Sequence, residues 1–200
     1  MAVHAEAEQH HHGPPPVHHS SRVDPATLGM FLFIASEVML FGSFFTAYFF
    51  VRVINGAPWP PEEFHLPVYV AGVNTAILVT SSFTIHWALQ AIKRDNRAGL
   101  KAGLVLTLAL GLVFLLTQVR EYSRVGFAPH DGAFGSIFYG LTGLHGAHVL
   151  VGLVLLTMAT IRAFRGHYSA AHHHGVELPG IYWHFVDVMW IVVYVTIYVV

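Results

Sequence analysis

Seven titratable side chains lie within, or at the ends of, long apolar stretches of this sequence. They are Glu37, His86, Glu121, His145, His148, His184 and Asp187. A charged side chain at the middle of a bilayer costs roughly 2.5 to 3.5 kcal/mol on insertion scales. Such groups therefore need a partner, a proton or water. Three kinds of chemistry are open to them: metal binding, proton transfer, and hydrogen bonding that fixes helix packing.

The spacing of these residues suggests how they could combine. His145 and His148 are three positions apart and share one face of a helix. With Glu37 and Asp187 they would form a set of two histidines and two carboxylates, similar to the metal centres of helix bundles. Buried carboxylates and histidines also make proton relays, although the sequence has no visible inverted repeat and no mid-helix Gly or Pro break. The residues alone favour a structural role, in which groups such as His184 and Asp187 form hydrogen-bonded pairs, and we predict no metal site.

Membrane-spanning helices are the elements that must position these groups. The 200-residue chain is 54% hydrophobic and 10% charged, with a mean hydropathy of +0.56, which excludes a water-soluble globule. About 20 apolar residues span a bilayer core of roughly 30 Å. Five stretches are long enough, at residues 26–53, 66–92, 102–124, 132–165 and 178–200. Because these runs are continuously apolar, the sequence predicts an all-α, polytopic membrane helix bundle and not a β-barrel.

Local signals predict where the helices begin and which faces they bury. Asp24 and Pro25 are typical of an N-cap and first turn, and Pro67 and Pro179 are expected at the starts of the second and fifth helices. Trp59 is a candidate anchor at the membrane interface. Lipid-facing positions are expected at Val186, Met189 and Val193. A close helix approach is expected at Gly140, Gly143 and Gly146.

The distribution of positive charge predicts the orientation. One side of the membrane receives Arg22, Lys93, Arg94, Arg97, Lys101, Arg162 and Arg165, and the other receives Arg52, Arg120 and Arg124. By the positive-inside rule, the N-terminus is cytoplasmic and the C-terminus is outside. Residues 1–24 are rich in His and Pro and lack a signal-peptide pattern, so we expect a disordered cytoplasmic tail. The absence of cysteine excludes thiolate metal sites, and nucleic-acid binding is not indicated.

Several longer motifs resemble subunit III of haem-copper terminal oxidases, the cytochrome c oxidase and quinol oxidase family. They are FLFIASEVMLFGSFFTAYF, GLTGLHGAHVLVG and YWHFVDVMWIVVYVTIYV. The stretch LLTQVREYSRVGFAPHDGAFGSIFYGLTGLHGAHV, which contains Glu121, is similar to the family's order of Glu, aromatic, Asp-Gly, Gly-Ser, Phe and His-Gly-x-His. The resemblance runs from about Pro25 to Val200 and leaves out the His-rich tail.

The resemblance implies an accessory subunit that docks on the catalytic subunit I. The partner subunits would carry the haem and copper, this chain would hold no cofactor beyond bound phospholipid, and the complex would couple oxygen reduction to proton pumping. The chain would support proton uptake and stability of subunit I in a bacterial plasma membrane. The resemblance is to the five-helix form of the family and leaves the electron donor, cytochrome c or quinol, open. A small proton-coupled transporter is the alternative.

The resemblance also gives expectations for single residues. Glu37 corresponds to the family's carbodiimide-reactive carboxyl, and we expect it to be protonated in the resting protein. His184 and Asp187 are expected to pair with polar residues of neighbouring helices, with Glu37 and His148 among the candidates. Apart from the resemblance, the histidines of the tail and of the loop before the last helix are expected to buffer protons, to bind metal adventitiously or to be simply solvated.

Overall fold

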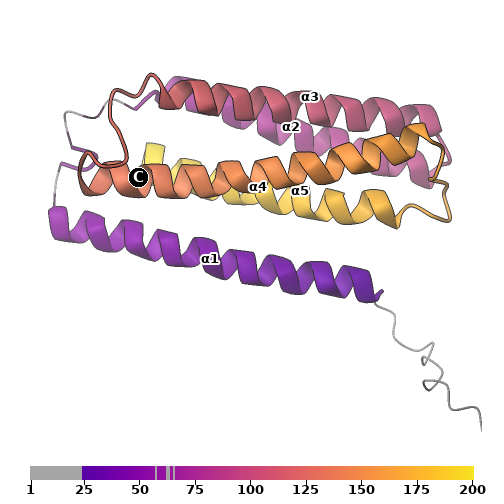
Figure 1. The fold of residues 1–200 in the computed structure, drawn as a ribbon, viewed down its shortest axis with the longest axis horizontal. Helices are drawn as coiled ribbons and strands as arrows, with labels where there is room; N and C mark the ends of the chain where they lie inside the picture. The colour runs from indigo at the N-terminus through magenta and orange to yellow at the C-terminus, as the bar shows by residue number, and fades with distance from the viewer. Residues whose placement is uncertain (1–23, 57, 62–63, 65) are drawn as a thin grey trace, which may run out of the picture.

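The computed structural model describes residues 24–56, 58–61, 64 and 66–200, so nearly all of the predicted N-terminal tail lies outside the described residues. Five long helices occur within these ranges, and they alternate in direction (Figure 1). They are α1 (Pro25–Asn55), α2 (Val68–Lys93), α3 (Arg97–Tyr122), α4 (Gly132–Phe164) and α5 (His174–Tyr194), which continues into the π-helical turn η1 (Val195–Val199). All five are long and apolar enough to cross a membrane. The predicted all-α, five-helix fold is confirmed.

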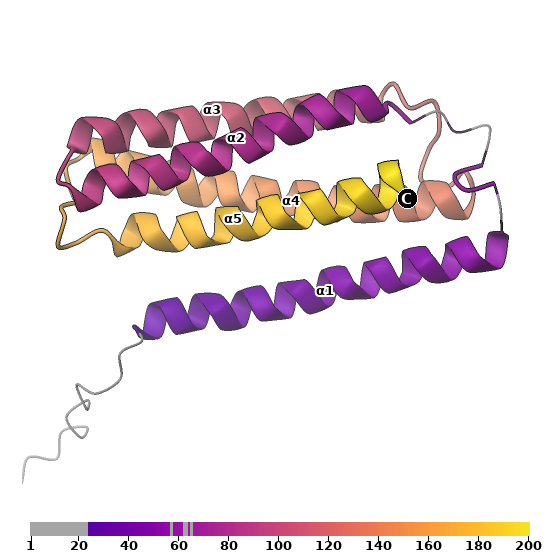
Figure 2. The same ribbon diagram turned by 180° about the vertical axis from the view of Figure 1, so that it is seen from behind.

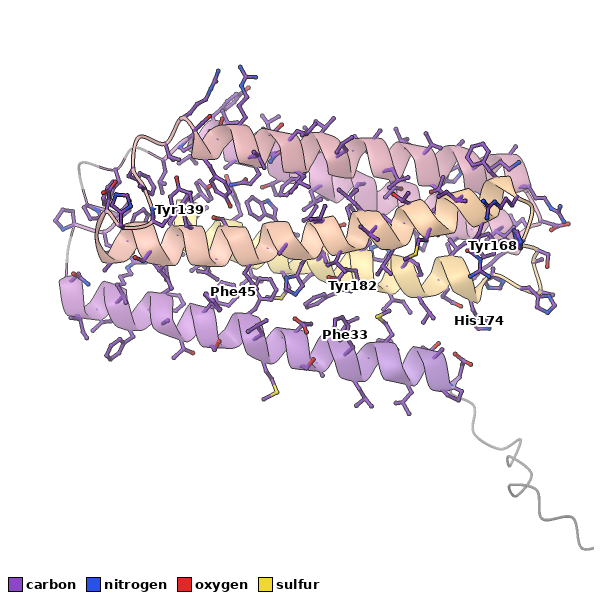
Figure 3. All side chains as sticks on the ribbon, in the orientation of Figure 1. Phe33, Phe45, Tyr139, Tyr168, His174 and Tyr182 are labelled. Carbon is purple, nitrogen blue, oxygen red and sulfur yellow. The ribbon has the colours of Figure 1, made fainter. Side chains whose placement is uncertain are left out.

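The helices divide into a four-helix bundle, α2 to α5, and a peripheral helix, α1. In both ribbon views α1 lies to one side of the bundle, with α4 and α5 as its neighbours (Figures 1 and 2). Only Phe41 and Tyr48 of α1 are buried, whereas α4 and α5 bury residues along most of their lengths. Phe33 of α1 stacks on Tyr182 of α5, with ring centroids 6.1 Å apart, in the space between α1 and the bundle (Figure 3). Much of the remaining surface of α1 is apolar and exposed.

Side-chain caps explain where two of the helices begin. The Thr27 N–H donates to Asp24 Oδ2 at 3.0 Å, and Pro25 is the first residue of α1, as predicted. The Gly99 N–H donates to Asn96 Oδ1 at 2.9 Å, so α3 begins at Arg97, five residues before the expected residue 102. The predicted first residue lay too far along the chain because charged residues interrupt the apolar run. Such residues are nevertheless compatible with the end of a helix that emerges from the membrane.

The predicted start of the fifth helix is wrong, because α5 begins at His174 and Pro179 lies inside it. Proline has no N–H, so it leaves the carbonyl of the residue four positions earlier, Gly175, without its helical donor. The Tyr168 hydroxyl donates to this carbonyl at 3.3 Å. Tyr168 and His174 therefore lie at the same end of the bundle (Figure 3). A hydrogen bond from outside the helix thus allows proline within it.

The bundle core is built around two tryptophans of α5, Trp183 and Trp190, both fully buried. Trp183 lies against two glycines, because a Cβ added at Gly111 of α3 or at Gly152 of α4 would lie 2.6 or 2.7 Å from its ring. By contrast, a Cβ at Gly143 would meet nothing within 4 Å. A Cβ at Gly146 would only just reach Leu115, at 4.0 Å, and one at Gly140 would lie 3.1 Å from Phe44. The predicted close approach through all three of these glycines is therefore wrong, and the tightest approaches lie elsewhere.

The predicted lipid-facing positions of α5 are also wrong. Val186, Met189 and Val193 are buried, whereas Val188 and Ile191 are exposed. The reason is that α5 contacts α2, α4 and α1, so most of its circumference is covered. Apolar character does not separate the two faces, because both lipid and protein core accept apolar side chains.

Trp59 lies in the connection between α1 and α2 and is partly buried. Its Nε1–H donates to the Tyr48 hydroxyl at 3.2 Å, and its ring packs edge-on against Phe134 at 5.3 Å. Trp59 therefore ties the end of α1 to the start of α4. Its predicted role as a membrane-interface anchor stays a prediction.

Candidate functional site

Glu37 of α1 and His148 of α4 form a direct pair between the peripheral helix and the bundle. His148 Nε2 lies 2.9 Å from Glu37 Oε2, and His148 Nδ1 lies 2.8 Å from the carbonyl oxygen of Leu144. The two side chains are only 17% and 11% exposed. The rings of Phe41 and Phe185, with centroids 4.9 and 6.3 Å from that of His148, screen the pair on its inner side.

The geometry of this pair defines where its protons lie. A carbonyl oxygen only accepts hydrogen bonds, so His148 Nδ1 must carry a hydrogen. The other nitrogen, Nε2, then faces the Glu37 carboxyl, and a contact of 2.9 Å requires a proton between them. That proton belongs either to a neutral carboxylic acid or to a doubly protonated imidazole. In both forms the pair is neutral overall, which removes the cost of burying a single charge.

A second polar cluster joins α2 to α5 and consists of Ser82, His184 and Asp187. The Ser82 hydroxyl donates to Asp187 Oδ2, and Ser82 Oγ lies 2.9 Å from His184 Nδ1. A serine hydroxyl carries one hydrogen, so when it donates to Asp187 its oxygen accepts from the Nδ1–H of His184. Asp187 is buried and its Oδ1 has no partner among the described residues, whereas His184 is partly exposed.

The expected pairing of His184 and Asp187 with neighbouring helices holds for Ser82 of α2 and not for Glu37 or His148. The two residues share one face of α5, as their spacing predicted, and the serine bridges them. Ser82 was not among the predicted site residues. A usable signal was present: a run of three hydroxyl residues, Thr80, Ser81 and Ser82, interrupts the apolar sequence of α2, and Ser82 lies one helical turn before His86.

The remaining sequence candidates are not brought into either cluster. His145 is fully buried between the rings of Trp190 and Phe114, at centroid distances of 4.7 and 5.7 Å, and neither ring nitrogen has a partner among the described residues. His86 is exposed on α2, where its Nε2 lies 3.0 Å from Gln90 Nε2. Glu121 lies in the last turn of α3, and its carbonyl accepts from the Val125 N–H at 3.0 Å.

The family model for cytochrome c oxidase subunit III matches residues 6–200. The cytochrome c oxidase subunit 3 of Thermostichus vulcanus is 40% identical over 183 residues, which cover 91% of this chain and 90% of the relative. The subunit 3 of Equus caballus is 39% identical over 188 residues, covering 90% and 72%, and that of Lemur catta is 40% identical, covering 90% and 69%.

This chain belongs to the cytochrome c oxidase subunit III family. The resemblance seen in the sequence motifs is thus confirmed, and it extends over nearly the whole chain. Membership in the family makes the chain a subunit of a cytochrome c oxidase complex.

The polar groups of this family member do not assemble the metal set considered from the sequence. Glu37 and His148 bind each other, Asp187 binds Ser82, and His145 is enclosed by aromatic rings. Within the described ranges, no three or more His, Cys, Asp or Glu side chains are placed to hold a metal ion. The two-histidine, two-carboxylate interpretation is therefore wrong. Each of these four side chains instead takes part in a contact between two helices or, in the case of His145, is enclosed by aromatic rings.

Proposed function

We propose that the chain is the accessory, non-redox subunit III of a respiratory haem-copper oxidase, and that it supports proton uptake and stability of the catalytic subunit I. The observation that carries the proposal is the 40% identity to a cytochrome c oxidase subunit 3 over about nine tenths of both chains. Haem and copper belong to the partner subunits, where oxygen is reduced to water and protons are pumped. The acidic and histidine side chains of this chain serve helix contacts and proton exchange.

The exposed face of α1 supports a partner or lipid on that side. Leu32, Met39 and Phe50 are 65%, 76% and 65% exposed, and all three are apolar. An apolar face of this kind suits a bilayer or the transmembrane helices of subunit I. The Glu37–His148 pair lies on the opposite, inner side of α1 and holds the helix in place. We propose that α1 transmits the docking of the complex to the bundle through this pair.

A phospholipid fits a second feature between α1, α4 and α5. A cavity of about 340 Å³ opens there, lined by apolar side chains that include Met30, Leu155, Met158 and Leu178. Arg162 also lines it, with its guanidinium carbon 5.7 Å from the centre of the Tyr168 ring. Apolar walls with a cation at one end suit an acyl chain and a phosphate group.

Charge supports a cytoplasmic location for one end of the bundle, which we call the basic end. This end carries the residues Lys93, Arg94, Arg97, Lys101, Arg162 and Arg165, and the opposite end carries Arg52, Arg120 and Arg124. By the positive-inside rule the basic end faces the cytoplasm of a bacterial cell, with the C-terminus outside. The N-terminal tail would then be cytoplasmic as well.

Histidines gather at the basic end, in the loop between α4 and α5. The rings of His173 and His174 stack with centroids 5.8 Å apart, and His174 Nδ1 lies 3.3 Å from Glu177 Oε2. Glu177, in the first turn of α5, also lies 3.7 Å from Lys93 Nζ, which ties the start of α5 to α2. Histidine exchanges protons near neutral pH, so this surface supports a role in collecting protons for subunit I.

Replacing the loop histidines His172 and His173, together with the tail histidines, by asparagine is expected to slow oxidase turnover chiefly at high pH, because proton supply limits the rate there. The measurement is oxygen consumption by the purified complex across pH. His130→Asn is the matched control, since His130 is an exposed histidine at the opposite end. Rates that match the wild type at every pH would reduce these histidines to solvated surface.

Purification through this subunit in mild detergent tests the proposed function itself. We expect haem absorption bands and a large multi-helix chain to co-purify, and oxygen consumption with cytochrome c or a quinol to identify the electron donor. A colourless chain that purifies alone in several detergents would favour the transporter alternative. That alternative predicts proton-coupled transport by the isolated chain in liposomes.

A further inference from the structure

We propose that Ser82, His184 and Asp187 form a proton relay, through which the buried carboxyl of Asp187 exchanges protons with the surface formed by α2 and α5. Two hydrogen bonds connect the three side chains in series, from His184 Nδ1 to Ser82 Oγ and from Ser82 Oγ to Asp187 Oδ2. The carboxyl of Asp187 has no other hydrogen bond among the described residues, and its Oδ1 is buried without a partner. Ser82 is therefore the connection through which a proton reaches or leaves the carboxyl.

The outer end of the relay is accessible, whereas the inner end is not. His184 is partly exposed and Asp187 is 4% exposed, although both lie on the same face of α5. His86 is exposed on α2, one helical turn from Ser82. Gln90 hydrogen-bonds His86 at 3.0 Å and continues this polar strip toward the basic end. His86 and Gln90 thus form a polar strip along α2 from the turn after Ser82 toward the basic end, which would carry protons to the relay.

Proton transfer along the three groups forms as many bonds to hydrogen as it breaks, and a hydrated proton is the only reactant that it needs. With Asp187 ionised, a hydronium ion gives its proton to His184 Nε2 and leaves as water, and the Nδ1–H bond breaks as its proton moves to Ser82 Oγ. The original Ser82 O–H bond breaks as that proton moves to Asp187 Oδ2. The products are a carboxylic acid, a serine hydroxyl and a neutral imidazole with its hydrogen on Nε2. Both hydrogen bonds persist in this transfer with their directions reversed. Replacement of the Asp187 proton by one from the solvent also requires the serine hydroxyl and the imidazole to reorient between successive transfers, so that the incoming proton moves on to the carboxyl.

The relay deepens the proposed role in proton uptake and rests on it for its purpose, but its own test does not need oxidase turnover. Infrared spectra of the purified complex give a carboxylic acid band for Asp187, identified as the band that is lost in Asp187→Asn. The experiment follows the shift of this band on transfer to D₂O, at a pH at which the wild-type band is present. The rate of that shift reports proton exchange at Asp187 alone.

Two variants break the relay in different ways. Ser82→Ala removes the connecting hydroxyl. In His184→Asn the side-chain amide takes the place of Nδ1 and still donates to Ser82, but it cannot pass a proton on. Both are expected to slow exchange by about tenfold or more, because exchange then requires local opening of the helix contact. A merely structural role of His184 predicts no change in His184→Asn.

Two further variants serve as controls. Ser82→Thr keeps the hydroxyl and is expected to exchange like the wild type. So is Thr80→Ala, which removes an exposed hydroxyl of the same helix that bonds only the Ala76 carbonyl. Wild-type exchange in either Ser82→Ala or His184→Asn would overturn the relay. If both variants slow exchange but leave oxidase turnover unchanged, the relay is supported and has no part in proton uptake. If both variants also slow turnover, the relay contributes to proton uptake by the oxidase.

Discussion

Replacing Gly152 by alanine is expected to destabilise the bundle by about 1 to 3 kcal/mol, because the added methyl overpacks the core. Its carbon would lie 2.7 and 2.8 Å from two ring atoms of Trp183. The ring cannot move aside easily, since its Nε1–H donates to Ser81 Oγ at 2.8 Å and its far edge lies against Gly111. Thermal release of the subunit from the complex measures the effect.

Gly143→Ala is the matched control on the same helix, because a Cβ there meets nothing within 4 Å. Alanine is a better helix former than glycine by roughly 0.8 to 1 kcal/mol, so this variant is expected to be neutral or slightly stabilising. Equal behaviour of Gly152→Ala and Gly143→Ala would show that Trp183 does not pack as described. A Gly111→Ala variant, which approaches the same ring from α3, is expected to resemble Gly152→Ala.

The number and approximate position of the helices followed from the sequence because each is a long, continuous apolar run. The start of α1 also followed, since its cap lies within three residues of it, from Asp24 to Thr27. The start of α5 did not, because it depends on Tyr168, which replaces the donor that Pro179 lacks. A residue outside the helix decides where the helix begins. Local pattern does not contain that information.

The faces of α5 could not be predicted for a different reason. In a soluble helix, polar residues mark the outer face, but lipid is as apolar as a protein core. Val186 is buried and Val188 is exposed, and nothing in the two side chains distinguishes them. Only the placement of α1, α2 and α4 around α5 does so. Polar residues carry more information, and for this reason His184 and Asp187 were correctly expected to share a face and find a partner on a neighbouring helix.

The partners themselves are separated by long stretches of sequence. Glu37 and His148 are 111 positions apart, and Ser82 and Asp187 are 105 positions apart. The sequence indicated which groups need a partner, because an isolated charge in the membrane is costly. It did not indicate that these groups separate into two independent clusters, or that a serine connects one of them. Those features depend on the order in which the helices pack.

Glu37→Ala is expected to weaken the attachment of α1 by about 1 to 3 kcal/mol, because it leaves the Nε2 of His148 without a partner in a nearly enclosed site. Glu37→Gln is expected to behave like the wild type, since its amide N–H donates to Nε2 as a protonated carboxyl would. The measurement is again thermal release from the complex. Ser36→Ala is the control, because Ser36 is exposed next to Glu37 and bonds only the carbonyl of Phe33.

The comparison of these variants decides which form of the pair exists. In a neutral pair the proton stays on Glu37, so glutamine reproduces its hydrogen bond. In an ion pair the imidazole is charged, and glutamine would remove its counter-charge and leave a single charge in a nearly enclosed site. A Glu37→Gln variant as unstable as Glu37→Ala would therefore contradict a protonated Glu37, as would an infrared spectrum that shows an ionised carboxylate at neutral pH. We expect the neutral form, because separating two charges in so apolar a setting costs more than leaving the shared proton on the carboxyl.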